Sequence, residues 1–182
     1  MVMLEKVLFN EDINIKEDIT ALLIEAFPIN ERPPVDYFFM SLKRKENTLI
    51  AYYEKDIFIG FSYITIYKDI CYIFFLAVKK EFRQKGYGSQ IIECLKEDYQ
   101  DKVLLLCYEE VDQKYDDYNN RLKRENFYKK CGFKDNNLKT NEYGVIFKTA
   151  YIGKRKVSFS EYQEIFKLGF GKGSEKYLKE EK

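Results

Sequence analysis

The chain has 182 residues, with 31 Lys and Arg, 30 Asp and Glu, and no His, so its formal net charge is +1. This length predicts one domain with a sizeable buried core, and the balanced charge predicts neither a nucleic-acid partner nor an anionic membrane surface. Without histidine, Ser–His–Asp and Cys–His nucleophile chemistry and His-based metal sites are excluded, so acid–base chemistry must fall to Asp, Glu, Lys, Cys or Tyr.

The cysteines and the apolar runs indicate the compartment. None of Cys71, Cys94, Cys107 and Cys131 forms a C-x-x-C pair, so neither a zinc ribbon nor a thioredoxin-type redox site is expected. Small buried hydrophobes in a reducing compartment are the favoured interpretation. No basic region followed by an apolar core opens the chain, and its longest apolar run, Ile70–Val78, is far shorter than the ~20 residues of a membrane span. We therefore expect a cytoplasmic protein with no metal site and no membrane contact.

The first part of the chain reads as two helices and a hairpin. Apolar residues at helical spacing predict a helix over 15–26, which Pro28 ends, and a second short helix over 35–42 opened by proline. Two runs rich in β-branched and aromatic residues then predict strands over 48–53 and 57–67. The short polar link between them favours a hairpin.

The middle of the chain predicts a strand–helix–strand unit. Residues 70–78 form a continuous β-branched and aromatic run, as expected of a strand buried on both faces. A polar, glycine-containing segment separates it from a helix over 89–99, and a short buried strand over 103–107 follows. Such a unit implies a right-handed crossover and at least one parallel pair of strands.

A second helix and a second hairpin follow. Residues 108–117 form an acidic loop, and residues 119–131 form a charged helix that ends at a glycine. Strands are predicted over 133–139 and 142–151, joined at Thr140–Asn141. Because hairpins flank the parallel pair, the sheet is expected to be mixed.

The end of the chain predicts one more helix and a tail. Ser160 and Gln163 are expected to form a capping box for a helix that ends at Gly169. The whole order, ααβββαβαββ plus a C-terminal helix, predicts an α/β fold with a central mixed, twisted sheet flanked by helices. We expect a single domain over residues 1–168 and a frayed tail over 169–182.

One segment is suited to bind an anion. It runs Leu76-Ala77-Val78-Lys79-Lys80-Glu81-Phe82-Arg83-Gln84-Lys85-Gly86-Tyr87-Gly88-Ser89 and joins a buried strand to a helix through a glycine turn. Glycines let the backbone approach a ligand closely, and a helix start presents amides and the positive end of its dipole. The segment predicts a site for a phosphate or pyrophosphate. The alternative is a simple turn whose glycines serve geometry alone.

A second motif suggests a family. Asn126-Phe127-Tyr128-Lys129-Lys130-Cys131-Gly132-Phe133 ends a helix and begins a strand. Together with the R-x-x-G-x-G loop and the order of elements, it resembles the GNAT acetyltransferases, which move an acyl group from coenzyme A to an amine. The resemblance covers residues 1–151 in architecture and 70–133 in motif. It implies an N-acetyltransferase that uses acetyl-CoA as its co-substrate and transfers the acetyl group directly.

The resemblance also implies roles for the residues of both motifs. The main chain of Leu76, Ala77 and Val78 would bind the pantetheine arm, and the loop would wrap the pyrophosphate through Arg83, Gln84, Lys85, Gly86, Tyr87, Gly88 and Ser89. Tyr128 would protonate the departing thiolate, because a phenol with a pKa near ~10 stays protonated at neutral pH. The alternative for Tyr128 is a packed aromatic ring.

Two positions depart from the family pattern in the charged helix. Arg121 stands where many members have an asparagine, so either Asn120 substitutes for it or Arg121 reaches a phosphate. Arg124 replaces a common alanine, and the basic helix that carries it is either a solvated face or a contact for the adenosine phosphates.

The acceptor side is less defined. Glu109 is the favoured general base, and the alternative is that it belongs to a solvated acidic face with Glu110, Asp112, Asp116 and Asp117. If this face lines the acceptor cleft, it favours a cationic amine such as a polyamine, an aminoglycoside or a lysine. In relatives the loop between the first two helices contacts the acceptor, so Glu31 and Arg32 are candidate acceptor-binding residues or a mere surface pair.

Two functions therefore compete. The first is N-acetylation of a small-molecule or peptide amine by a monomer or homodimer. The second is a non-catalytic acyl-CoA sensor or interaction module on the same fold, which the replaced asparagine favours.

Overall fold

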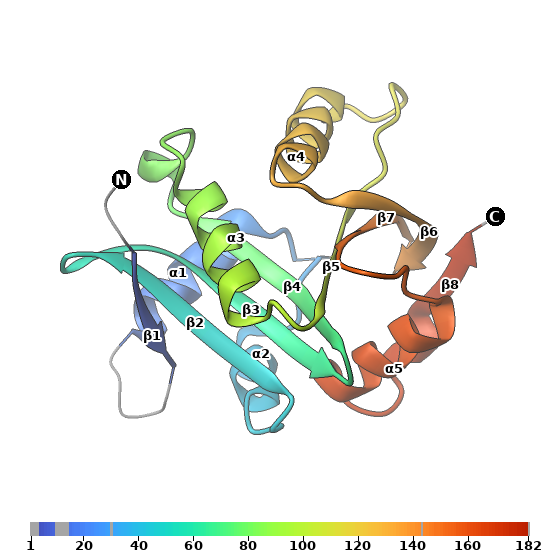
Figure 1. Ribbon diagram of the computed structural model, residues 1–182, viewed down its shortest axis with the longest axis horizontal. Coiled ribbons are helices and arrows are strands. Elements are labelled where there is room, and N and C mark those ends of the chain that lie inside the picture. Colours follow the sequence, from blue (N-terminus) through green and yellow to red (C-terminus); the bar gives the residue numbers. More distant parts are fainter. Residues whose placement is uncertain (1–3, 10–14, 30, 143, 182) are drawn as a thin grey trace. The chain divides into compact units, whose positions relative to one another are not determined.

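A computed structural model describes residues 4–9, 15–29, 31–142 and 144–181. Within this part of the chain, eight strands are hydrogen-bonded in the order β1-β2-β3-β4-β5-β7-β6-β8 (Figure 1). The predicted α/β architecture, a mixed sheet flanked by helices, is confirmed. The chain divides into two compact units, called unit 1 (Met1–Thr65 and Ile73–Asp98) and unit 2 (Ile66–Tyr72 and Tyr99–Lys182).

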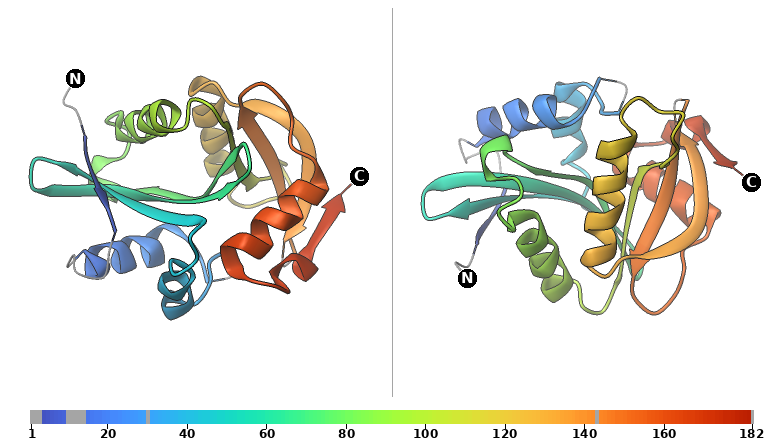
Figure 2. Two further views of the ribbon diagram at one scale, coloured as in Figure 1. Left: turned by 60° about the horizontal axis from the view of Figure 1, so that its bottom comes forward. Right: turned by 90° about the horizontal axis from the view of Figure 1, so that it is seen from above.

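Unit 1 is a sheet covered by helices on both faces. Its strands are β1 (Glu5–Leu8), β2 (Asn47–Glu54), β3 (Ile57–Tyr67) and β4 (Ile70–Val78), of which β3 and β4 run on into unit 2. Antiparallel pairing joins β1 to β2 and β2 to β3. Helices α1 (Lys16–Ala26) and α2 (Val35–Ser41) cover one face, and α3 (Tyr87–Asp98) covers the other (Figure 2). Fully buried Ile19, Leu23, Phe38, Phe61 and Tyr63 show that the predicted amphipathic helices pack on the predicted strands.

Strand β1 was not predicted from the sequence. It has four residues, and its exposure pattern shows no alternation of buried and exposed side chains, because only Val7 is half-buried. Its place in the sheet rests on backbone pairing with β2, in which Lys6 lies opposite Tyr52. An edge strand held by main-chain bonds leaves little trace in hydrophobic periodicity.

Unit 2 is built around an antiparallel arrangement. Its elements are β5 (Val103–Glu109), α4 (Tyr118–Lys130), β6 (Lys134–Glu142), β7 (Val145–Ile152), α5 (Phe159–Phe170) and β8 (Leu178–Glu181). Strand β7 lies between β5 and β6 and is antiparallel to both, and β8 pairs antiparallel with β6. Helices α4 and α5 lie on opposite sides of these strands (Figure 2).

The second hairpin turns later than predicted. Thr140 and Asn141 lie within β6, where they pair with Phe147 and Ile146 of β7, rather than in the turn. Thr140 is fully buried. The turn includes Gly144, whose φ of +91° suits a glycine. The mistake arose because Thr and Asn are common turn residues, while the burial of Thr140 depends on tertiary contacts.

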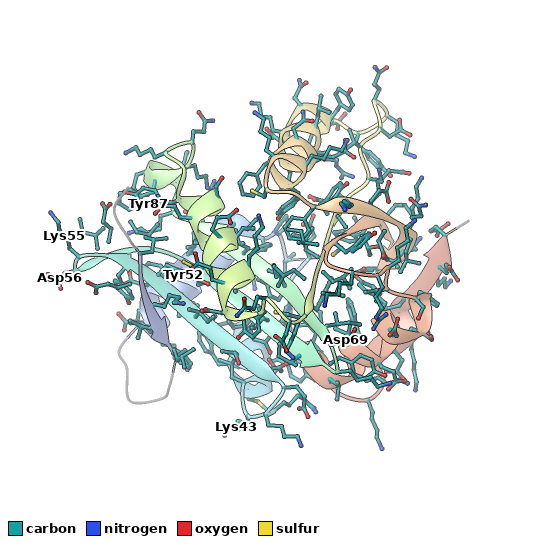
Figure 3. The ribbon with its side chains drawn as sticks, viewed as in Figure 1. Lys43, Tyr52, Lys55, Asp56, Asp69 and Tyr87 are labelled. Carbon is teal, nitrogen blue, oxygen red and sulfur yellow. The ribbon has the colours of Figure 1, made fainter. Side chains whose placement is uncertain are left out.

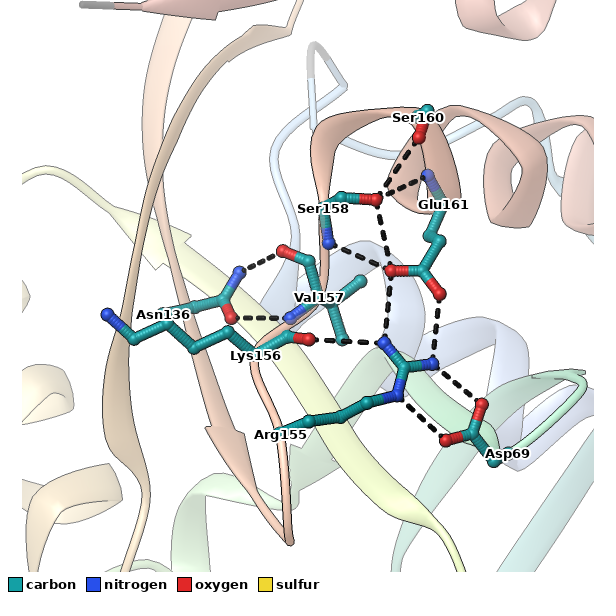
Figure 4. A network of polar contacts seen from close by, with 8 residues as sticks. All are labelled: Asp69, Asn136, Arg155, Lys156, Val157, Ser158, Ser160 and Glu161. Atoms are coloured by element: carbon teal, nitrogen blue, oxygen red, sulfur yellow. Dashed lines mark hydrogen bonds and ion pairs between the residues drawn. The ribbon is translucent and has the colours of Figure 1, made fainter.

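The predicted capping box is two residues out of place. Ser158, not Ser160, is the N-cap of α5, and the reciprocal partner is Glu161 rather than Gln163. Ser158 N donates to Glu161 Oε2 at 3.0 Å, and Glu161 N donates to Ser158 Oγ at 3.4 Å (Figure 4). Ser158 has the extended conformation of an N-cap, with φ −79° and ψ 161°, and Ser160 lies inside the first turn.

The segment expected to fray is ordered as far as Glu181. Helix α5 continues to Phe170, Gly171 with φ +91° is its C-cap, and a 3₁₀ turn (η2, Ser174–Tyr177) leads into β8. Four residues of β8 pair with Lys139–Glu142 of β6. The prediction of a frayed tail was therefore wrong over 169–181, because long-range strand pairing orders a segment whose own composition is charged and polar.

Arg155 ties three parts of unit 2 together. Its guanidinium binds Asp69 through Nε and Nη2 at 2.9 and 2.7 Å, and Glu161 through Nη1 and Nη2 at 3.1 and 2.9 Å (Figure 4). Nearby, the Asn136 side chain forms two hydrogen bonds of 2.8 Å with the backbone of Val157.

Within the described part of the chain, no helix is long and apolar enough to cross a membrane.

Candidate functional site

The end of β4 lies very close to β3 in unit 1. A Cβ atom placed on Gly60 would lie 2.2 Å from the carbonyl oxygen of Ala77, so only glycine fits at this position. Ala77 and Val78 are buried and Leu76 is half-buried. Leu76, Ala77 and Val78, which are predicted to bind pantetheine, are thus the last three residues of β4. The path of β4 beside β3 depends on Gly60.

The loop after β4 is anchored by Arg83. A 3₁₀ turn (η1, Lys80–Phe82) follows the strand. Arg83 Nε then donates to the carbonyl oxygen of Val78 at 2.8 Å, and its Nη2 donates to Glu25 on α1 at 2.6 Å. In this structure the Arg83 guanidinium binds protein groups, and these contacts position the loop.

The glycine turn presents backbone to the surroundings. Gln84 and Gly86 have positive φ angles of 62° and 89°, and Gly86 is exposed. Its carbonyl accepts the hydrogen bond of Gln90 N at 3.1 Å, which opens the first turn of α3. Amides of a helix's first turn have no acceptor within the helix and lie at the positive end of its dipole. These residues fit a pyrophosphate, because left-handed backbone followed by a helix start forms a concave anion site.

Side chains of the same loop pack on one another and on β2. Tyr87, labelled in Figure 3, is the first residue of α3. Its hydroxyl donates to Glu54 Oε2 at 2.9 Å, and this bond raises the pKa of Tyr87. The Phe82 and Tyr87 rings meet edge to face at 5.7 Å, and Lys85 Nζ lies 5.5 Å from the centre of the Phe82 ring. Gly88 and Ser89 continue into α3. The loop is thereby held in one shape by its own side chains.

Tyr128 lies in the last helical turn of α4 in unit 2, surrounded by aromatic rings. Its ring centre is 5.7 Å from that of Tyr108, 5.2 Å from Phe127 and 5.8 Å from Phe133. The side chain is half-buried, and among the described residues no hydrogen bond reaches its hydroxyl. Burial raises the pKa of Tyr128 to about 12. The hydroxyl is therefore protonated at neutral pH and available as a donor.

Glu109 is held by Arg124, whose helix was expected to be either a solvated face or a contact for the adenosine phosphates. The Arg124 guanidinium on α4 donates to the carboxylate of Glu109 at the end of β5, where Glu109 is only 4% exposed. The positive charge of Arg124 also lowers the pKa of Tyr128, against the larger effect of burial. Unit 2 thus brings Tyr128, Arg124 and Glu109 together. The only sequence signal for Arg124 was its departure from the family's alanine.

Arg121 and the acidic loop bind each other. Arg121 Nε donates to Asp117 at 2.7 Å, its Nη1 donates to the Glu110 carbonyl at 3.1 Å, and its guanidinium lies 3.9 Å from the centre of the Tyr115 ring. Asn120 is exposed in the first turn of α4. Two residues were candidates to replace the family's asparagine. Of these, Arg121 binds groups of the acidic loop, and Asn120 is exposed.

Most carboxylates of the acidic loop form ion pairs with lysine or arginine. Glu110 binds Lys139 at 2.7 Å and Lys114 at 3.4 Å, and both lower the pKa of Glu110. Asp112 binds Lys114 at 3.1 Å. This face is therefore close to neutral rather than strongly acidic.

The two candidate acceptor residues lie in unit 1, in the loop between α1 and α2. Arg32 Nε donates to the carbonyl of Phe27 at 3.1 Å, and Glu31 N donates to the carbonyl of Pro28 at 2.9 Å. The Phe27 ring packs against Phe75 of β4 at 5.0 Å. The loop is thus fixed on β4 of the same unit. No group of three metal-ligating side chains occurs among the residues that the structure describes.

Known proteins resemble this chain at the level of both sequence family and fold. The family model for an acetyltransferase (GNAT) domain matches residues 44–135, half of the chain, and this range includes both motifs. No curated protein matches the chain. A protein from Bacteroides thetaiotaomicron assigned to the GNAT family has 18% identity and a TM-score of 0.75, over 92% of this chain and 98% of its own.

Two further structures share the fold. A Bacillus subtilis acetyltransferase in complex with CoA has 17% identity and a TM-score of 0.62, over 83% of this chain and 99% of its own. An aminoglycoside 6'-N-acetyltransferase from Enterococcus faecium has 16% identity and a TM-score of 0.61, over 84% of this chain and 99% of its own. Identities this low indicate a common fold, and the family model carries the assignment. The chain belongs to the GNAT family of acyl-CoA-dependent N-acyltransferases.

Proposed function

We propose that this enzyme transfers an acetyl group from acetyl-CoA directly to a primary amine, with Tyr128 as the general acid. The observation that carries the proposal is the Tyr128 hydroxyl. It lies in the predicted Phe127-Tyr128 motif, burial raises its pKa to about 12, and no described residue accepts its proton. A protonated phenol without a protein acceptor is suited to give its proton to a departing thiolate.

Two residues of the chain would each carry out one proton transfer of the reaction. Bound acetyl-CoA supplies the thioester carbon to which the amine nitrogen bonds. Tyr128 gives its proton to the sulfur as the carbon–sulfur bond breaks. Glu109, which Arg124 holds in place at the end of β5, is the proposed acceptor of the proton that the amine loses.

The co-substrate would be bound mainly by backbone. The proposed contacts are the main chain of Leu76–Val78 for the pantetheine arm and the amides of Gly86–Ser89 for the pyrophosphate. The positive φ of Gly86 and the side-chain packing around Tyr87 support this, because they present amides rather than side chains. Asn120, exposed at the start of α4, is a further proposed contact of the co-substrate.

The acceptor is proposed to be a small-molecule or peptide amine, with Glu31 and Arg32 among its contacts. One neighbour in fold acetylates aminoglycosides by its name, and another, from Escherichia coli, is named for the alanine of ribosomal protein S18. The paired charges of Glu110 and Asp112 give no support for a strongly cationic acceptor. A primary amine of either kind fits the proposal.

A two-step experiment tests this function. At one hundred times its dissociation constant, acetyl-CoA should raise the free energy of unfolding by about 2.7 kcal/mol, and the melting temperature of the protein should rise accordingly. A thiol-release assay against a panel of small amines, polyamines and peptides should then show CoA release that depends on the amine. Binding of acetyl-CoA with no turnover on any amine would contradict catalysis and favour an acyl-CoA sensor.

A further inference from the structure

The end of the β2–β3 hairpin in unit 1 contacts the loop that is proposed to bind the pyrophosphate, through a residue outside both sequence motifs. Glu54, the last residue of β2, is half-buried and accepts a hydrogen bond from the Tyr87 hydroxyl at 2.9 Å. Tyr87 is the first residue of α3. A carboxylate on β2 is therefore bonded to the start of the helix whose amides are proposed to bind the anion.

The direction of the Glu54 side chain follows from its place in the sheet. Successive side chains of a strand point to opposite faces. Burial, and then the negative charge of Asp18 on α1, raise the pKa of Tyr53, so Tyr53 lies on the face that α1 covers. Glu54 therefore points to the opposite face, which α3 covers (Figure 2).

A β-bulge in the same hairpin also supports the end of β4. The register of β2 and β3 shifts between Tyr52 and Tyr53, which leaves Ile59 as the extra residue of β3. A bulge bends its strand and increases the local twist. The carbonyl oxygen of Ile59 accepts a hydrogen bond from Lys79 N at 2.9 Å, and Lys79 directly follows β4. One hairpin thus contacts both segments that are proposed to bind acetyl-CoA: the end of β4 through its backbone, and the start of α3 through Glu54.

The rest of the loop packs on the ring that Glu54 holds. Phe82 lies before the glycine turn and Tyr87 lies after it, and their rings meet edge to face at 5.7 Å. The turn between them includes Gly86, whose φ is +89° and where an added Cβ would meet nothing within 4 Å. Gly86 therefore has no side-chain packing to fix its flexible backbone. Holding the Tyr87 ring from β2 fixes the shape of the turn instead.

The group that holds Tyr87 is a carboxylate beside an anion site, which is an electrostatic disadvantage. A carboxylate and a pyrophosphate repel each other, so charge alone would favour a neutral or cationic residue at this position. Glu54 instead provides an acceptor for the phenol, and a hydrogen bond to a charged acceptor is stronger than one between neutral groups. Its contribution to the site is therefore geometric. An amide that keeps the acceptor and removes the charge should replace it.

We propose that Glu54 is a positioning residue for acetyl-CoA: its bond to the Tyr87 hydroxyl holds the start of α3 in the orientation that binds the pyrophosphate. This inference rests on the proposed function, because it assigns the anion site to the same loop. Glu54 acts through Tyr87 and takes no part in acetyl transfer itself. Its loss should therefore change the affinity for acetyl-CoA and leave kcat at saturating acetyl-CoA unchanged.

Two substitutions separate the hydrogen bond from the charge. Glu54→Ala removes both, and it should raise the dissociation constant and the KM of acetyl-CoA by about tenfold. Glu54→Gln keeps an acceptor for the phenol, and its dissociation constant should exceed that of the wild type by no more than about twofold. The control Asp56→Asn removes an exposed carboxylate from the same hairpin, where asparagine suits the turn, and should bind acetyl-CoA as the wild type does. Titration calorimetry and steady-state kinetics measure these quantities.

A double-mutant cycle tests whether Glu54 acts through Tyr87. Tyr87→Phe alone should weaken acetyl-CoA binding as much as Glu54→Ala does, and combining the two substitutions should cause no further loss. Additive losses in the double variant would overturn the positioning role. So would a Glu54→Gln variant that binds acetyl-CoA as weakly as Glu54→Ala.

Hydrogen exchange tests the same bond without acetyl-CoA. Gln90 N donates to the Gly86 carbonyl at 3.1 Å in the first turn of α3. Amide exchange in the peptide that contains Gln90 should be faster in Glu54→Ala and in Tyr87→Phe than in the wild type. Equal exchange in all three proteins would overturn the inference. A wild-type protein that binds no acetyl-CoA would contradict the proposed function instead, and the exchange rates would still decide whether Glu54 holds the start of α3.

Discussion

The rings of Tyr108 and Tyr128 lie 5.7 Å apart, yet their hydroxyls have different surroundings. Tyr108 on β5 is buried and donates to Glu125 Oε1 at 3.2 Å. The Tyr128 hydroxyl on α4 has no hydrogen bond to any residue that the structure describes. The two phenols thus share one aromatic cluster, but only Tyr128 has a proton that the protein itself does not bind.

Tyr128→Phe is expected to reduce kcat by about a hundredfold, because general acid catalysis by one side chain contributes at least this much. The acetyl-CoA dissociation constant should stay nearly the same, since the ring packing is kept. Steady-state kinetics together with thermal shift by acetyl-CoA measures both quantities.

Tyr108→Phe is the matched control for this experiment. It should lower the free energy of unfolding by about 1 kcal/mol through loss of the bond to Glu125, and leave kcat largely intact. Loss of acetyl-CoA binding in Tyr128→Phe would show that Tyr128 is structural, and equal losses of kcat in both variants would contradict its role as the acid.

Gly86→Ala is expected to weaken acetyl-CoA binding. The φ of +89° costs an alanine about 1 kcal/mol, and nothing lies within 4 Å of the added Cβ, so the loop should relax its backbone rather than clash. Gly144→Ala is a close control, because its φ is +91° and its Cβ also meets nothing within 4 Å. Titration calorimetry should show weaker acetyl-CoA binding for Gly86→Ala alone. Equal affinities in the two variants would argue against the loop as the pyrophosphate site.

Arg124→Met is expected to destabilise the protein by about 1–3 kcal/mol, because it leaves the buried Glu109 carboxylate without its partner. Lys123→Met removes a neighbouring exposed cation and should change the free energy of unfolding by less than about 0.5 kcal/mol. Denaturant unfolding of both variants provides the comparison. If Glu109→Gln restores the stability of Arg124→Met, the loss is due to the unpaired carboxylate, and failure to restore it would contradict this explanation.

Arg155→Ala is expected to lower the free energy of unfolding by about 1 kcal/mol at neutral pH, since its ion pairs are partly exposed. Arg155 lowers the pKa of Asp69 and of Glu161 below their ordinary values of 3.8 and 4.5. Lowered folded-state pKa values add stability above the unfolded-state values, and that stability is lost as pH falls through the folded-state values.

The difference between Arg155→Ala and the wild type should therefore be constant above pH 4.5 and shrink below pH 3.8. Thermal unfolding between acidic and neutral pH measures this, with Lys154→Ala as the control, because it removes the same charge from an exposed neighbour. A stability difference that grows towards acidic pH would have the wrong sign for this network (Figure 4).

Local sequence patterns were sufficient to predict most helices and strands. They failed where pairing between distant segments determines the position of a turn or strand. The helices from Lys16 and from Tyr118 and the strand Ile70–Val78 follow from residue spacing alone. The turn at Gly144 and the strand β8 did not, because burial of Thr140 and pairing of Leu178 with Glu142 join parts of the chain that are distant in sequence.

For the site, the sequence by itself determined the two motifs, the family they resemble and Tyr128 as the candidate acid, because these depend on residue types at short spacing. Only the tertiary structure decided the surroundings of each group. Arg83 binds Val78 and Glu25, Glu109 binds Arg124, and Glu142 accepts hydrogen bonds from Tyr162 and Thr140. Partners of this kind are set by the packing of helices and strands around each side chain, and the same packing controls burial and hence the pKa of each group.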